Sequence, residues 1–366
     1  PPKHDLRPGQ PDVTTFPTTA WLRSARRALT GAPAAVYGYG DPRGHLELRT
    51  ALAAYLGRAR GVRVTPAQIV ITSGYVQALA LLATVVGGSR AIAMENPGLP
   101  FHRDVVRHAG TRVVPLDVDE LGARTDRLGT AGQPDVGAVV LTPGHQYPMG
   151  MTLAPQRRHA AVDWARDHDG VIIEDDYDGE FRYDRQPVGA LQGMAPDHVV
   201  FVGTASKTLG PALRLAWMVL PDRLVESVVE AKRHVDIHSE TTTQLTLADL
   251  IAGHAYDRHV RSCRLRYRRR RDVMVERLGR DVALSGIAAG LQALVRLPSQ
   301  GPTEQEVLNR ATAYGLGLGE LGSHWHESGD HEQGLIVGYG APTNSAYPAA
   351  LDALAHTFRA TGVLSK

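Results

Sequence analysis

The chain has a single cysteine, Cys263, among its 366 residues, so it cannot form an internal disulfide. It has no excess of either charge, with 40 lysines and arginines against 38 aspartates and glutamates. This balance gives no general reason to expect a nucleic acid or an acidic membrane as partner. No apolar run approaches the roughly 20 residues that cross a bilayer, and no signal peptide opens the chain. Together these absences favour a cytoplasmic protein with no membrane partner.

What is present predicts a large α/β protein. Hydrophobic residues make up 43% of the chain, enough for a large core, and the length favours about two domains. Short apolar runs alternate with helical patterns. The runs are residues 69–72, 91–95, 112–116, 136–142, 171–175 and 198–203. Such alternation predicts a mostly parallel central sheet flanked by helices.

The pattern divides the chain into three parts. We expect an N-terminal arm over residues 1–44, a large domain over 45–235 and a smaller C-terminal α/β domain over 236–366. Residues 223–233 and 245–281 are predicted to form long helices. In open α/β sheets, ligands bind beyond the carboxyl ends of the strands. The residues that directly follow the strands are therefore the first candidates for a functional site.

Several post-strand residues have chemistry that a site could use. Lys207 follows a buried strand, where loss of hydration lowers the pKa of an amine and leaves it able to attack a carbonyl. Asp175 ends another strand and can pair with a cationic ring nitrogen, and Tyr177 can donate to a phenolate oxygen. Residues 73–75 join a strand to a helix start, where free N–H groups bind phosphate. Arg214 lies in an apolar stretch and needs an anionic partner.

Each of these features also has an ordinary interpretation. A lysine usually extends to solvent, an acidic loop is often merely solvated, and many strand-to-helix turns bind nothing. In combination they are more specific, because they supply a lysine for a Schiff base, an acid for a pyridine nitrogen, a tyrosine for a ring hydroxyl and a phosphate site. The combination predicts pyridoxal 5′-phosphate (PLP) as cofactor.

Longer motifs follow one another along nearly the whole chain. They are DLRPGQPD at 5–12, YGDPRG at 39–44, SGYVQAL at 73–79, TPGHQYPMG at 142–150, EDDYDGEFRY at 174–183 and SKTLGPALR at 206–214. With these motifs the chain resembles the aminotransferase-like domain of the MocR/GabR group. That group lies within the fold-type-I PLP-dependent proteins, in the class I/II aminotransferase superfamily.

The resemblance implies roles for individual residues. Lys207 would hold the cofactor, Asp175 would contact its ring nitrogen and Tyr177 its ring oxygen. Tyr39 would reach the cofactor phosphate of a neighbouring subunit, which implies a homodimer with the active site at the subunit interface. The other residues near the ring or its phosphate would be Ser73, Gly74, Tyr75, His145, Gln146, Thr204, Ser206 and Arg214.

Leu99 departs from the family pattern. Relatives usually place an aromatic residue there, which stacks on the cofactor ring, and leucine adds no stacking interaction. Tyr75 or Phe101 could compensate. Leu99 and Phe101 are accordingly candidate substrate contacts.

Ile336 is a second departure. It occupies the position at which aminotransferases of this fold carry the arginine that holds the substrate carboxylate. Another residue must then bind the carboxylate, or the substrate is not a simple α-amino acid. In relatives the loop that contains His324 and His326 approaches the active site, so these two are candidate substrate contacts. The spacing of the histidines is not that of a zinc site, and we expect no metal.

Two functions remain open. The first is a PLP-dependent aminotransferase-like enzyme that acts on an amino acid or amine, with β-elimination, decarboxylation or racemisation as other outcomes. The second is the PLP- or amine-sensing domain of a MocR-type regulator of the GntR family, whose winged helix-turn-helix would precede Pro1. A fold that has lost its cofactor is disfavoured, because the key residues are intact. Seven arginines in residues 261–271 fit a charged interdomain helix better than a nucleic-acid contact, so we expect no nucleic acid bound through this chain itself.

Overall fold

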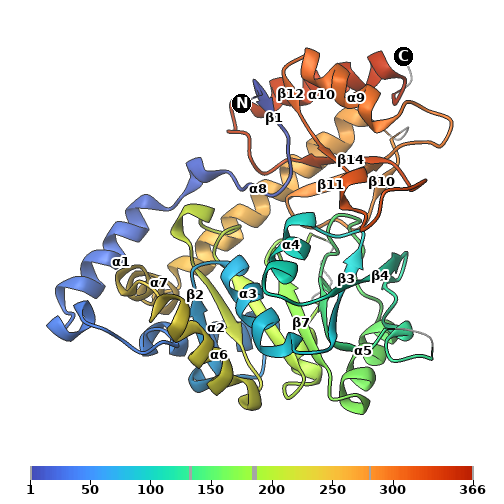
Figure 1. Ribbon diagram of the computed structural model, residues 1–366. Helices are drawn as coiled ribbons and strands as arrows, with labels where there is room; N and C mark the ends of the chain where they lie inside the picture. The colour runs from blue at the N-terminus through green and yellow to red at the C-terminus, as the bar shows by residue number, and fades with distance from the viewer. Residues whose placement is uncertain (1, 132–133, 184–187, 280–281, 365–366) are drawn as a thin grey trace.

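The computed structural model describes residues 2–131, 134–183, 188–279 and 282–364 (Figure 1). Its larger part is built on a sheet in the strand order β2-β9-β8-β7-β6-β3-β4-β5. The strands are β2 (Ile69–Thr72), β3 (Ala91–Asn96), β4 (Val113–Asp119), β5 (Gly122–Ala123), β6 (Val136–Leu141), β7 (Val171–Asp176), β8 (Val199–Thr204) and β9 (Ala216–Val219). The five adjacent strands β8, β7, β6, β3 and β4 are parallel, whereas β2, β9 and β5 join antiparallel.

Helices cover both faces of this sheet, which explains why its central strands are continuous Val, Ile and Ala runs. On one face, α3 (Tyr75–Gly87), α4 (Pro100–His108) and α6 (Asp222–Asp236) pack in one apolar cluster. On the other face lie α2 (Leu46–Arg60) and α5 (Pro155–Asp167). The predicted fold class, a mostly parallel sheet flanked by helices, is confirmed.

The smaller part packs around α8 (Ala255–Leu278) and a sheet in the order β10-β11-β14-β13. Its strands are β10 (Leu284–Ser285), β11 (Gln292–Arg296), β13 (Gly319–Glu320) and β14 (Gly334–Gly338), with the helices α9 (Glu304–Ala313) and α10 (Tyr347–Thr361). Short 3₁₀ turns occur at Val13–Thr15, Ala34–Tyr37, Pro66–Gln68, Thr125–Arg127, Leu191–Met194, Pro211–Leu213 and Gly322–His324.

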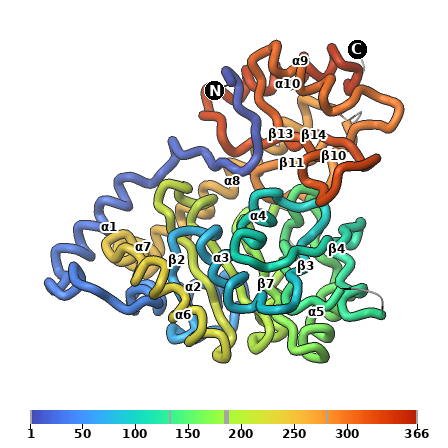
Figure 2. Tube along the Cα trace, viewed as in Figure 1, coloured from blue at the N-terminus to red at the C-terminus, as the bar shows by residue number. Residues whose placement is uncertain are grey.

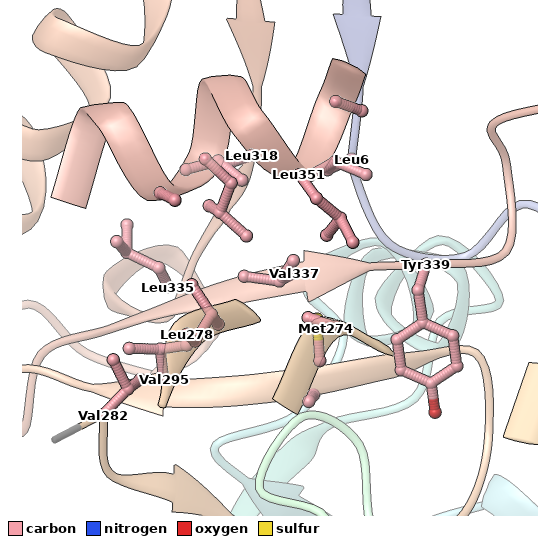
Figure 3. Close-up of a cluster of buried hydrophobic side chains, with 14 of the residues drawn as sticks. Leu6, Met274, Leu278, Val282, Val295, Leu318, Leu335, Val337, Tyr339 and Leu351 are labelled. Carbon is pink, nitrogen blue, oxygen red and sulfur yellow. The ribbon is translucent and has the colours of Figure 1, made fainter. Parts of the chain in front are cut away.

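The N-terminal segment contacts both parts. Strand β1 (His4–Asp5) pairs with β12 (Leu316–Gly317), and Leu6 packs in the small part's core with Val337 and Leu351 (Figure 3). The chain then passes down to α1 (Thr18–Thr30), which lies beside α7 (Thr241–Ala252) on the larger part (Figure 2). A buried ion pair between Asp12 and Arg270, 2.8 Å long, fixes the N-terminal segment to α8 where it passes between the two parts.

The prediction of one long helix over 245–281 is wrong, and its last two residues lie outside the described ranges. The segment forms two helices, α7 and α8, separated at Gly253 and His254. His254 adopts the left-handed conformation with φ 56°, which ends the helical path. Helix α7 packs with α2 of the larger part. We therefore propose that the boundary between the two parts lies within α8 rather than at residue 236.

Candidate active site

A cavity lies beyond the carboxyl ends of the parallel strands, where the N-terminal segment and the small part meet the sheet. It is the position that this sheet topology favours for a ligand. Its lining residues are Pro8, Gly9, Tyr75, Val76, Met94, Glu95, Gly98, Leu99, His102, Arg103, Val140, Thr142, Tyr147, Asp175, Tyr177, Thr204, Ser206, Lys207, Arg214 and Gln292. Eight of the predicted site residues are among them: Tyr75, Leu99, Asp175, Tyr177, Thr204, Ser206, Lys207 and Arg214.

Lys207 extends from the turn after β8 into this cavity, and its Nζ donates to the carbonyl oxygen of Gly9. Burial lowers the pKa of the Lys207 ammonium, against the opposing charges of Asp178 and Asp175. The amine therefore loses its proton more easily than an exposed lysine would. A neutral amine is the form that attacks a carbonyl carbon.

Asp175 lies near the end of β7 and is buried. Neither its Oδ1 nor the hydroxyl of the neighbouring Tyr75 has a partner at full hydrogen-bond geometry in the part of the chain that the structure describes, although the Tyr75 hydroxyl lies close enough to Asp175 to act on its pKa. Burial raises the pKa of Asp175 well above its usual value. A buried carboxylate oxygen without a donor is costly, and a protonated ring nitrogen would supply one. This feature fits the predicted cofactor.

Tyr177 is held by residues from distant parts of the sequence. Its hydroxyl accepts a hydrogen bond from Nε2 of Gln292 at 3.0 Å and lies 3.1 Å from Nδ1 of His145. The same His145 nitrogen is 2.7 Å from Oδ2 of Asp178. His145 itself does not line the cavity. It lies behind Tyr177 and fixes the position of the phenol.

The predicted phosphate-binding residues meet at the start of α3. Nη2 of Arg214 donates to the carbonyl oxygen of Ser73 at 2.7 Å. A Cβ at Gly74 would lie 2.3 Å from the same nitrogen, so only glycine permits this approach. The hydroxyl of Thr204 donates to that of Ser206 at 2.9 Å. An arginine beside hydroxyls and a helix N-terminus fits a phosphate group.

His102 is a cavity residue that the sequence analysis missed. Its ring contacts the Tyr75 ring, with centroids 4.6 Å apart and planes at 34°. Burial and the charge of Lys207 lower the pKa of His102 to about 4, so the imidazole is neutral near pH 7. Phe101, by contrast, is 59% exposed and lies outside the cavity. The available signal was spacing, because His102 lies one helical turn after Leu99.

The two histidines of the small part do not line the cavity. The His324 ring packs on Tyr147 at 5.4 Å, and Nε2 of His326 is 3.1 Å from the carbonyl oxygen of Glu95. Burial lowers the pKa of both imidazoles to about 4. They lie next to the cavity wall rather than in it, and their role as substrate contacts remains a prediction.

Tyr39, which was predicted to reach a neighbouring subunit, lies away from the cavity. It is 87% exposed, and its ring edge contacts His238 at 6.1 Å.

Among the described residues there is no cluster of three or more His, Cys, Asp or Glu side chains that could hold a metal ion. Within the same residues, no helix has the length and apolar character needed to span a membrane.

Glu95 is a second cavity residue that the sequence analysis missed. Its carboxylate accepts hydrogen bonds from the Thr142 amide and from Nε2 of Gln146, both at 3.1 Å. Burial raises the pKa of Glu95 to about 7. The three groups join the ends of β3 and β6 at the cavity wall. The protonation state of Glu95 therefore affects both stability and the cavity.

We expect the stability difference between Glu95→Gln and the wild type to depend on pH. The folded pKa of Glu95, about 7, exceeds its ordinary value of 4.5. The group's stabilising contribution is therefore full below about pH 4.5 and is lost as pH rises through 7. Glutamine does not ionise, so the variant does not lose this stability as pH rises. The free energy of unfolding of the variant, relative to that of the wild type, should therefore increase by about 1–3 kcal/mol from pH 5 to pH 8. Urea unfolding at both pH values measures it, with exposed Glu120→Gln as control. A constant difference would refute the assignment.

The geometry defines a class of protein, an α/β fold with a lysine, an aspartate and a phosphate site around one cavity. The family model "Aminotransferase class I and II" matches residues 1–313, and the chain belongs to this family. Membership confirms the resemblance drawn from the motifs and the predicted cofactor, PLP.

Several curated relatives are named as regulators, and one is named as an aminotransferase. The chain is 35% identical to the uncharacterized HTH-type transcriptional regulator YdeL of Bacillus subtilis, over 85% of this chain and 68% of that protein. It is 30% identical to the pyridoxine biosynthesis transcriptional regulator PdxR of Corynebacterium glutamicum, over 93% and 73%. Among solved structures, α-aminoadipate aminotransferase LysN of Thermus thermophilus, complexed with N-(5′-phosphopyridoxyl)-L-leucine, has a TM-score of 0.86 at 22% identity, over 98% and 92%. This likeness supports the fold.

Proposed function

We propose that this chain binds PLP covalently through Lys207 and acts on the amino group of a small amine or amino acid. The observation that carries the proposal is the unpartnered Oδ1 of Asp175, which lines the same cavity as the Lys207 amine. A pyridine nitrogen kept protonated by Asp175 makes the bound cofactor an electron sink for negative charge at the substrate α-carbon. The other residues hold the group in place.

Each side chain has a distinct task in this proposal. Tyr177, fixed by Gln292 and His145, would donate to the ring oxygen. Arg214 would bind the phosphate. The Lys207 amine would remove or return the proton at the substrate α-carbon, and burial, which lowers its pKa, favours the proton-free form that this task needs. Transamination, elimination and decarboxylation share these residues.

A second candidate function is sensing. The sequences of the regulators YdeL and PdxR match this chain over most of its length. This similarity favours a PLP- or amine-sensing domain of a MocR-type regulator. The same cavity would then bind cofactor and amine without releasing a product. A reading frame that continues upstream of Pro1 with a winged helix-turn-helix would favour this function.

We further propose a cytoplasmic homodimer in which Tyr39 reaches the phosphate bound by the partner subunit. The contact between Tyr39 and His238 brings together two segments that carry exposed apolar side chains, Tyr37 on one and Val235 and Ile237 on the other, and so forms an apolar patch. Such a patch is typical of a protein interface. Cys263 is free and buried, in keeping with a reducing compartment. The molar mass in solution, from light scattering, tests the dimer.

The experiment that tests the function is incubation of the PLP-loaded protein with a panel of amines and amino acids. Absorbance follows the cofactor, and mass spectrometry identifies products. An oxo acid with the amino group retained on the cofactor indicates transamination, and an oxo acid with released ammonia indicates β-elimination. Loss of carbon dioxide indicates decarboxylation, and an absorbance change without product indicates sensing. A protein that neither binds PLP nor responds to any amine would contradict both functions.

A further inference from the structure

Three cationic side chains occur among the residues that line the cavity: Lys207, Arg214 and Arg103. The proposed function uses the first two, for covalent attachment and for the phosphate. Arg103 has no assigned task, although it is only 5% exposed. Charged side chains are rarely buried to this extent without a partner of opposite charge.

The contacts of Arg103 are all with backbone carbonyls. Nη1 donates to the oxygens of Gly98 and His324, at 2.8 and 2.7 Å, and Nη2 donates to the oxygen of Trp325 at 3.1 Å. Within the described ranges no carboxylate lies at ion-pair distance from it. Burial lowers the pKa of Arg103; the charge of Arg107 acts in the same direction, and the charge of Asp104 on the next residue opposes it without forming an ion pair. The guanidinium thus keeps a positive charge that the protein does not neutralise.

Other buried arginines of this chain differ. Arg60 pairs with Asp176 at 2.6 Å, and Arg270 pairs with Asp12. Arg158 also donates only to carbonyls, but it lies outside the cavity. An uncompensated buried guanidinium that borders a ligand cavity is specific to Arg103 among the described residues.

The unused donors of Arg103 suit a carboxylate. A guanidinium has five N–H groups, and these three hydrogen bonds leave Nε and one N–H of Nη2 without a protein acceptor in the described ranges. These two nitrogens form one edge of the guanidinium, which binds a carboxylate through two parallel hydrogen bonds. The Arg60–Asp176 pair in this chain uses the same edge, through Nε and Nη2.

Position 336 cannot take this task. Ile336 is fully buried in an apolar cluster with Met149, Met151, Leu294 and Leu321. The imidazoles at the cavity, His102 within it and His324 and His326 beside it, are neutral near pH 7, because burial lowers their pKa to about 4. A permanent positive charge is therefore offered neither by Ile336 nor by these three histidines.

We propose that Arg103 binds an anionic group of the substrate, a carboxylate above all, in place of an arginine at position 336. This rests on the proposed function and narrows its substrate class to amines that carry a carboxylate. Helix α4 lies below the small part (Figure 1). The hydrogen bonds of Arg103, on this helix, to the His324 and Trp325 carbonyls join the two parts there. A substrate carboxylate at Arg103 would therefore lie between the two parts.

The test compares amino acids with the matching amines that lack the carboxylate. PLP-loaded wild type is titrated with L-alanine and ethylamine, and with L-phenylalanine and 2-phenylethylamine, while cofactor absorbance reports binding. We expect the wild type to prefer each amino acid, and Arg103→Gln to reduce that preference at least about tenfold, as expected for loss of a bidentate contact. Arg103→Lys keeps the charge but loses the planar group that forms two parallel hydrogen bonds, so its preference for the amino acid should be intermediate. Arg107→Gln, at an exposed site on α4, is the matched control and should behave as wild type.

Arg103 also donates to backbone carbonyls, so its replacement can disturb the fold. A second measurement therefore uses the wild type alone. Maleate, a dicarboxylate without an amine, should perturb cofactor absorbance in the wild type and compete with L-alanine but not with ethylamine. Equal binding of amino acids and amines by the wild type, or an unchanged preference in folded Arg103→Gln, would overturn the Arg103 proposal alone. A wild type that fails to load PLP would instead contradict the proposed function.

Discussion

Lys207→Ala is expected to lose completely the absorbance band, near the edge of the visible range, of the lysine-bound cofactor. The variant should still fold, because the side chain lies in a cavity and, among the described residues, hydrogen-bonds only to the carbonyl of Gly9. It should retain PLP only by reversible contacts, such as those of Arg214 with the phosphate. Absorbance after dialysis, with circular dichroism to verify folding, measures the effect.

The chain offers a clean control, because it has only four lysines, Lys3, Lys207, Lys232 and Lys366. Lys3→Ala changes an exposed lysine remote from the cavity and should leave the band unchanged. Lys232 is buried and paired with Asp236 at 2.6 Å, so it is not available to a cofactor. A band that borohydride still reduces in Lys207→Ala would refute the role of Lys207.

Asp175→Asn should have the second largest effect. The isosteric amide removes the negative charge that keeps the ring nitrogen protonated, and with it the electron sink. We expect covalent PLP binding to persist while conversion of the best amine in the panel slows by on the order of 10²–10³-fold, the typical cost of removing one preorganised electrostatic contact. Stopped-flow absorbance measures the rate.

Asp167→Asn is the matched control, because Asp167 is an exposed carboxylate at the end of α5. It should convert the amine at the wild-type rate. An unchanged rate in Asp175→Asn, with the cofactor bound, would show that the ring nitrogen does not depend on this carboxylate.

The predicted site residues that the structure brings together are those fixed by local topology. Asp175 lies near the end of β7 and Lys207 follows β8, and the carboxyl ends of these neighbouring parallel strands meet at one edge of the sheet. Gly74 follows β2 and Arg214 precedes β9, and the pairing of these two strands brings the proposed phosphate-binding residues together. Motif order and strand adjacency therefore sufficed to locate the centre of the cavity.

The cavity walls could not be predicted in the same way. Gln292 reaches Tyr177 from 115 positions along the chain, and the Arg103 contacts with residues 324 and 325 cross between the two parts. Such contacts depend on how the parts pack, which periodicity does not report. The break between α7 and α8 has the same origin, since α7 turns back onto α1 and α2.

The two departures from the family pattern now have a structural setting. Leu99 and His102, one helical turn later, both line the cavity. The His102 imidazole, which contacts the Tyr75 ring, therefore lies near the position where relatives carry an aromatic side chain. Ile336 completes an apolar cluster, in which an arginine would be an unpaired buried charge. Both changes fall at positions predicted to contact the cofactor ring or the substrate, while the residues proposed to hold the cofactor are retained.

The central claim is that Lys207 carries the cofactor, and the most direct test is chemical trapping. PLP-loaded protein is reduced with borohydride, digested and mapped by mass spectrometry, which fixes the cofactor to the lysine that held it. We predict a phosphopyridoxyl group on the peptide that contains Lys207 and on no other. A label on Lys3, Lys232 or Lys366, or no label on a protein that retains PLP, would contradict the claim.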